Sequence, residues 1–171
     1  LPSEFSYGDA TTITASYVDS YMGYWSSNYG AIRKTNQAIY ELYKYGQMSE
    51  EDKVRISAEL RFMRAFLYFD MVKRYKDVII YDENMENIVK DKAVSTEEEG
   101  WNFIQSDLEY AAANLPDRSA AKGRLSSGAA WAMLSRTMLY AERWEVAKNA
   151  ADEVQKLGYG LMKNYQDSYQ V

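Results

Sequence analysis

The 171-residue chain contains no cysteine and no histidine. Without these residues it has no thiol nucleophile, no disulfide, no Ser-His relay and none of the usual zinc ligands. We therefore expect no metal site, no cofactor and no catalysis of these types.

Proline and long apolar segments are also scarce. The only prolines are Pro2 and Pro116, and because proline interrupts the helical hydrogen-bond ladder, their scarcity favours helices. No apolar run approaches the roughly 18 residues of a membrane span. The net charge is −5 and no basic block could follow a phosphate backbone, so we expect no nucleic-acid partner.

Tyrosine is abundant instead, with 16 copies, half of them before residue 46. A tyrosine ring joins a flat apolar face to a hydroxyl group, which suits wet interfaces and polar ligands, although a helix bundle also uses tyrosine as bulky core filler. The stretch SYMGYWSSNYGAIRKTNQ, residues 20–37, concentrates these rings beside serine, glycine and amide side chains. The composition alone leaves open whether this stretch packs in a core or binds a ligand.

Two long helices are predicted in the first half of the chain. The first covers about 12–45 and ends at Gly46; its stripe at spacings of three and four comprises Tyr21, Trp25, Tyr29, Ile32, Asn36, Ile39 and Tyr43. The second covers about 50–75 after the capping residue Ser49. It is apolar around most of its circumference, so we expect other helices to sandwich it. Its charged residues are expected to form salt bridges: Glu59, Arg61, Arg64 and Asp70.

A polar excursion at about 76–95 separates these helices from three more. Thr96 and Glu99 resemble a capping box that opens a third helix, closed by Pro116. Ser126 or its neighbour caps a fourth helix, and a fifth follows a turn and stops at Gly158. From about 158 the tail has no closed pattern. The predicted fold is all-α, with residues 1–171 as a single helical domain.

Residues 131–154 match the spacing of a tetratricopeptide repeat, in which small residues let antiparallel helices approach while large ones fill the gaps. The positions concerned are Trp131, Leu134, Ser135, Trp144, Ala147 and Ala151. We therefore expect antiparallel helix pairs stacked as tetratricopeptide-like repeats.

Five motifs occur in turn along the chain: YGAIRKTNQAI (29–39), AELRFMRAFLYFDMVKRY (58–75), FIQSDLEYAAANLP (103–116), GRLSSGAAWAMLSRTMLYAERWEVAKNAADEV (123–154) and LGYGLMKNY (157–165). In this order they resemble the SusD/RagB family of Bacteroidetes outer-membrane lipoproteins, over about residues 17–169. The resemblance implies a SusD-like helical scaffold in a surface-exposed lipoprotein that captures an oligosaccharide. Such a protein acts as a lid on a SusC-type TonB-dependent transporter.

The chain departs from the family pattern in two ways. It begins at Leu1 and has no signal peptide or lipid-bearing cysteine, and family members usually continue further. We therefore expect an N-terminal scaffold piece, associated with the membrane only through a lipid anchor that this chain does not contain. The segment 76–80 also replaces the glycine-rich turn that the family tends to have after the RY dipeptide.

A sugar site needs exposed aromatic planes together with amide or charged groups that bind hydroxyls. The candidates are Tyr21, Tyr24, Trp25 and Asn28, in a region where some starch-binding members place aromatic and amide residues. Trp25 lies on the predicted stripe, so packing is its expected role, whereas Tyr24 is turned about 100° away and is the better candidate for exposure. Asn36 lies on the stripe, and a buried amide needs hydrogen-bond partners.

No pair of carboxylates indicates glycoside hydrolysis, so we expect no enzyme. The sequence favours non-enzymatic glycan capture and uptake. The alternative is a tetratricopeptide-type scaffold that binds a protein partner and no sugar.

Overall fold

The computed structural model of the chain describes residues 23–84, 92–119, 121–160, 162–164 and 166. Within these residues the regular elements are all helices, with one isolated antiparallel bridge between Val78 and Ser95. The helices are α3 (Trp25–Tyr45), α4 (Glu50–Tyr75), α5 (Glu97–Asn114), α6 (Ser127–Tyr140) and α7 (Trp144–Lys156). The predicted all-α class is confirmed.

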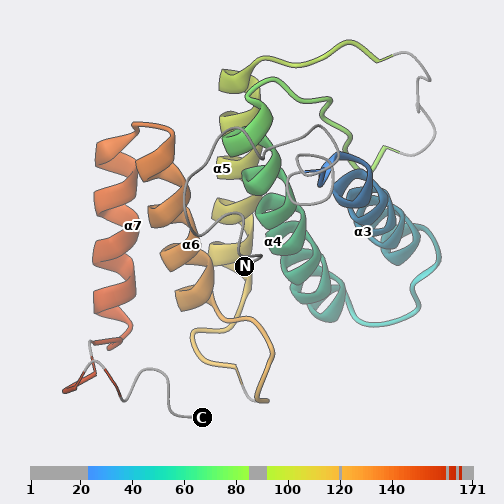
Figure 1. Cartoon of the computed structure of the whole chain (residues 1–171). Helices are drawn as coiled ribbons and strands as arrows, with labels where there is room; N and C mark the ends of the chain where they lie inside the picture. The colour runs from blue at the N-terminus through green and yellow to red at the C-terminus, as the bar shows by residue number, and fades with distance from the viewer. Residues whose placement is uncertain (1–22, 85–91, 120, 161, 165, 167–171) are drawn as a thin grey trace.

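Each helix packs on the next one along the chain, from α3 to α7, and α4 also contacts α6. Figure 1 shows α3 at one side, α4 and α5 in the centre, and α6 with α7 at the other side. The connections lie at alternating ends of the helices, so successive helices run antiparallel. This is the predicted arrangement of antiparallel helix pairs.

Local capping interactions determine where four of the helices start or end. The Ser49 side chain accepts a hydrogen bond from the Asp52 amide at 3.1 Å, and Thr96 and Glu99 form a complete capping box. Ser126 caps α6 in the same way. At the C-terminus of α3, a Cβ on Gly46 would lie 2.3 Å from the Leu42 carbonyl oxygen, so this turn requires glycine.

Helix α3 is shorter than predicted. It begins at Trp25, and Gly23 and Tyr24 precede it, so the expectation of one helix through these two positions is wrong. Glycine loses more backbone freedom in a helix than any other residue, which disfavours continuation through Gly23. The predicted residues 12–22, including Tyr21, lie outside the described part of the chain.

The main core lies between the helices and includes Ile32 of α3, Tyr68 and Val72 of α4, and Ile104 and Leu108 of α5. Each of these side chains is at most 1% exposed. The middle of the stripe predicted for α3 is buried, since Ile32, Asn36 and Ile39 are at most 1% exposed. The prediction is wrong for Tyr43, which is 46% exposed, so the buried stripe ends before the last turn of the helix.

Three aromatic or apolar side chains are more exposed than their sequence patterns predict. Met63 and Phe66 are each 49% exposed, so α4 is covered on most of its circumference but not on this outer face. Trp144 is 61% exposed and therefore does not fill a gap between helices, contrary to its assigned place in the repeat. Each residue lies on a face that no other described helix covers, and sequence periodicity does not reveal which faces are covered.

Candidate functional site

Three of the four predicted sugar-binding residues come together at the start of α3. Tyr24 precedes the helix, and Trp25 and Asn28 lie in its first turn. We call these three residues the α3 edge. The fourth candidate, Tyr21, lies outside the described residues.

The rings of the α3 edge have different surroundings, as expected. Trp25 is half-buried and packs edge-on against Tyr29 at 4.9 Å and Tyr75 at 5.1 Å between ring centroids. Tyr24 is 41% exposed. Packing therefore fixes Trp25, while Tyr24 presents its ring at the surface beside it.

The structure adds two residues of α4 that the sequence did not assign to this site. The Asn28 amide nitrogen donates a hydrogen bond to an Asp70 carboxylate oxygen at 3.3 Å. The other Asp70 oxygen accepts a hydrogen bond from Arg74 Nε at 3.0 Å, and the Arg74 guanidinium lies 4.6 Å from the centroid of the Tyr24 ring. The i,i+4 spacing of Asp70 and Arg74 indicates their ion pair. Nothing local in the sequence connects Asp70 to Asn28, which precedes it by 42 residues.

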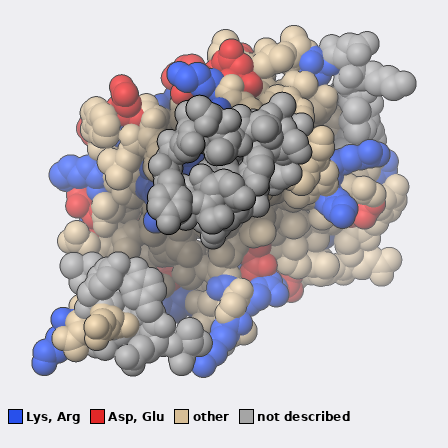
Figure 2. Space-filling view, in the orientation of Figure 1, with Lys and Arg blue, Asp and Glu red and all other residues tan. Residues whose placement is uncertain are grey.

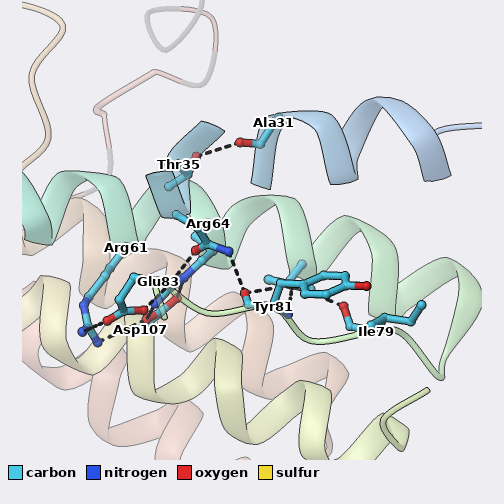
Figure 3. Close-up of polar contacts among 10 residues, drawn as sticks. Ala31, Thr35, Arg61, Arg64, Ile79, Tyr81, Glu83 and Asp107 are labelled. Atoms are coloured by element: carbon cyan, nitrogen blue, oxygen red, sulfur yellow. Dashed lines mark hydrogen bonds and ion pairs between the residues drawn. The ribbon is translucent and has the colours of Figure 1, made fainter. Parts of the chain in front are cut away.

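About two turns further along α3, a second group of polar side chains joins α3, α4 and α5. We call it the buried polar cluster; its members are Asn36, Arg61, Arg64, Glu83 and Asp107. Arg64 is 1% exposed, and its Nε and Nη2 donate to the two oxygens of Asp107 at 2.7 and 2.8 Å. Its Nη1 donates to Asn36 at 2.6 Å and to Glu83 at 2.7 Å. Figure 3 shows Arg61 and Arg64 directed toward Glu83 and Asp107.

These contacts confirm two expectations from the sequence. The buried amide of Asn36 is satisfied on both sides, because its nitrogen also donates to the Tyr81 carbonyl at 2.8 Å. The charged residues of α4 form ion pairs, including Arg61 with Glu83 and Glu59 with Arg124. Arg124, which precedes α6, donates hydrogen bonds to both carboxylate oxygens of Glu59.

Side chains of α3 and α4 hold segment 79–83, by the backbone at Ile79 and Tyr81 and by the carboxylate at Glu83. The Tyr29 hydroxyl accepts a hydrogen bond from the Ile79 amide at 2.7 Å, and the Tyr68 hydroxyl accepts one from the Tyr81 amide at 2.7 Å. Asn36 donates to the Tyr81 carbonyl, and Arg61 and Arg64 pair with the Glu83 carboxylate. Residues 79, 81 and 83 are therefore each bound by side chains of α3 or α4. Side chains thus take the place of a neighbouring strand.

Burial and charge shift the pKa values of these groups. Burial raises the pKa of Tyr29 to about 12 and also raises that of Tyr68, so both hydroxyls stay protonated at neutral pH. Burial opposes the charge of Arg64, but its bonds to Asp107 outweigh this and raise the Arg64 pKa. Burial raises the pKa of Asp107 against the effect of Arg64.

The pKa of Glu83 shifts in the opposite direction. Although partial burial opposes ionisation, the charge and hydrogen bond of Arg64 lower the Glu83 pKa below its ordinary value. The buried polar cluster thus consists of compensated ion pairs, and together with the protonated Tyr29 and Tyr68 it fastens segment 79–83 to the helices. The charged groups of the cluster are hydrogen-bonded to one another. This arrangement suits the attachment of segment 79–83 better than it suits proton transfer to a ligand.

The face of the molecule seen in Figure 2 carries charges of both signs. Figure 2 shows acidic and basic side chains interspersed around the visible face, without a continuous patch of one sign among the residues described. In the described ranges, no three acidic side chains converge as metal ligands. None of helices α3–α7 is long and apolar enough to cross a bilayer.

Comparison with known proteins identifies the family. Residues 3–139 match the model of a SusD-like family described as starch-binding and associating with the outer membrane. A SusD-like protein of Bacteroides ovatus is 31% identical, and the alignment covers 98% of this chain and 33% of that protein.

Two solved structures named for their sugars share the fold. A laminarin-binding SusD-like protein is 29% identical, with a TM-score of 0.76 over 85% of this chain and 33% of its own. A structure solved with a xylogluco-oligosaccharide is 31% identical, with a TM-score of 0.74 over 87% of this chain and 32% of its own. The chain spans about a third of the length of each of these proteins. The match of residues 3–139 and the identity to the relative from Bacteroides ovatus show that the chain belongs to the SusD-like family.

Proposed function

We propose that the chain is a helical domain of a protein that captures an oligosaccharide at the α3 edge, without catalysis, for import across the outer membrane. The observation that carries this proposal is that the start of α3 combines the exposed Tyr24 ring, the packed Trp25 ring and the Asn28 amide held by Asp70. The laminarin-binding and xylogluco-oligosaccharide structures of the same fold support it.

The chemistry of the α3 edge suits a sugar. The C–H face of a pyranose ring packs against an aromatic plane, and its hydroxyl rim exchanges hydrogen bonds with amide and charged groups. Trp25 is fixed by Tyr29 and Tyr75, so a sugar would meet it without first having to order it. Tyr24 supplies the more exposed plane and Asn28 the amide.

The proposed location and partner follow from the family. SusD-like proteins associate with the outer membrane. We propose a surface-exposed lipoprotein, anchored by a lipid outside this chain, that covers a SusC-type TonB-dependent transporter. The 171 residues serve as one helical domain of this assembly.

A glycan panel tests the proposal on the full polypeptide that carries this sequence. The panel includes laminarin oligosaccharides and xylogluco-oligosaccharides, and we expect at least one sugar to bind the wild type and to bind Asn28→Ala more weakly. Co-purification from outer membranes tests the transporter partner separately.

The second candidate function is a protein-binding scaffold without sugar binding. The exposure of Met63 and Phe66 on one face of α4 favours it, since adjacent exposed apolar side chains are typical of protein contacts. Failure of every sugar in the panel, together with co-purification of a transporter, would favour this scaffold over sugar capture.

A further inference from the structure

Two side chains of α4 lie directly against the α3 edge and contact two of its three residues. One carboxylate oxygen of Asp70 accepts from the Asn28 amide nitrogen at 3.3 Å, and the other accepts from Arg74 Nε at 3.0 Å. Arg74 in turn lies over the ring of Tyr24. Asp70 therefore links Asn28 and Tyr24 through a single carboxylate.

The contact with Asp70 determines how Asn28 presents its amide. A carboxylate only accepts hydrogen bonds, so the amide nitrogen of Asn28 must face it. The Asn28 carbonyl oxygen then points away from Asp70 and is held in place as an acceptor for a sugar hydroxyl. Without Asp70, the amide would be free to turn over and present either atom.

The contact with Arg74 determines which face of Tyr24 is available. The guanidinium lies 4.6 Å from the ring centroid and covers one face of the ring. Since the side chain is 41% exposed, a sugar would pack on the other face or on the rim. Asp70 holds Arg74 in this position through their i,i+4 ion pair.

We infer that Asp70 is a positioning residue for sugar binding: it orients the Asn28 amide directly and the Tyr24 ring through Arg74. This inference rests on the proposed function of the α3 edge. The side chains of Asp70 and Arg74 are 25% and 33% exposed, and ion pairs that reach solvent contribute little to the stability of a fold. The pair therefore differs from the buried Arg64–Asp107 pair, which fastens two helices.

A double-mutant cycle on sugar affinity tests the inference in the full polypeptide. The probe is the sugar of the laminarin and xylogluco-oligosaccharide panel that binds the wild type most tightly. The variants are Asn28→Ala, Asp70→Ala and the two combined, each measured by titration calorimetry and by thermal unfolding. Asp152→Ala is the matched control, because Asp152 forms an i,i+4 ion pair with Lys148 on α7, away from the α3 edge.

We expect Asp70→Ala to weaken binding about fivefold, the value of roughly one hydrogen bond, with a melting temperature close to that of Asp152→Ala. The affinity loss of the double variant should be smaller than the sum of the two single losses, because both substitutions disrupt the same presented amide. Any loss beyond that of Asn28→Ala would come from the Tyr24 ring, which Asp70 positions through Arg74. Asp70→Asn, which keeps an acceptor for Asn28, should recover part of the affinity.

Two results would overturn the inference. If Asn28→Ala weakens binding and Asp70→Ala does not, the α3 edge binds sugar but Asp70 does not position it. If no panel sugar binds the wild type, or Asn28→Ala binds as tightly as the wild type, the proposed site is wrong and the inference is wrong with it.

Discussion

Arg64 of α4 and Asp107 of α5 form a bidentate ion pair with both side chains at most 2% exposed. The remaining donor of Arg64 reaches Asn36 of α3 and Glu83 of the extended segment. One guanidinium thus connects three helices and the segment that follows α4. Arg64 therefore fixes the position of α3 relative to α4 and α5, and with it the position of the α3 edge.

Asp107→Ala should lower the free energy of unfolding by about 3–5 kcal/mol, because it leaves the buried charge of Arg64 without its main partner. Chemical denaturation of the wild type and the variant measures this difference.

The double variant Arg64→Met with Asp107→Leu separates charge burial from packing. We expect it to be more stable than Asp107→Ala, because no buried charge then lacks a partner. A loss below about 1 kcal/mol for Asp107→Ala would show that the ion pair is not the fastening we describe.

Acid should weaken the attachment of segment 79–83 through Glu83. Its pKa lies below the ordinary value of 4.5 in the folded state, so the unfolded state binds the proton more readily. The stability from this group is present above pH 4.5 and is lost as the pH falls through the folded-state pKa.

The comparison between the wild type and Glu83→Gln tests this effect, since carboxylates distant from position 83 titrate in both proteins and cancel. Burial raises the pKa of Asp107 in the wild type, and the charge of Glu83 adds to this rise. We expect the stability advantage of the wild type to shrink below pH 4.5, as measured by urea unfolding at several pH values. An advantage that stays constant down to pH 3 would contradict the assigned role of Glu83.

Gly100→Ala should destabilise the protein by about 1–3 kcal/mol. A Cβ at this position would lie 2.8 Å from a methyl group of Val72, where α5 crosses α4 closely. The double variant with Val72→Ala should recover part of this loss, which thermal unfolding would show.

Gly30→Ala is the matched control in α3, where a Cβ would meet nothing within 4 Å. Because alanine favours helix over glycine, this variant should be more stable than the wild type by about 0.5–1 kcal/mol. If both glycine variants changed stability equally, the close approach of α4 and α5 would not explain Gly100.

Trp25→Ala should reduce stability by about 2 kcal/mol, less than the loss for a fully buried tryptophan, because the ring packs on Tyr29 and Tyr75 but is only half-buried. Trp25→Phe should restore most of this stability. Chemical denaturation checks both variants, and an unchanged stability of Trp25→Ala would show that its ring is not part of the packing.

Helix positions were predictable where their signals are local. The caps at Ser49, Thr96 and Ser126, and the glycine at position 46, each depend on residues within one helical turn. The same is true of Ile32, Asn36 and Ile39 of α3, which repeat at helical spacing and are buried. Propensity and periodicity are sufficient for such features.

Long-range pairings were not predictable in the same way. The sequence indicated that Asn36 and Arg64 need partners, but not that they bind each other. The contact of Asn28 with Asp70 depends on how α3 crosses α4, which no local pattern encodes. Likewise, periodicity places Phe66 on an apolar face of α4 but does not reveal that this face lacks a neighbouring helix.

The affinity of Tyr24→Ala for the tightest-binding panel sugar, measured by titration calorimetry on the full polypeptide, tests the central claim most directly. Tyr24 is 41% exposed and its main described contact is with Arg74, so its removal should change stability by less than about 1 kcal/mol. We predict that the variant folds like the wild type and binds the sugar five- to tenfold more weakly, by about 1–1.4 kcal/mol. Wild-type affinity in the folded variant would contradict sugar capture at the α3 edge.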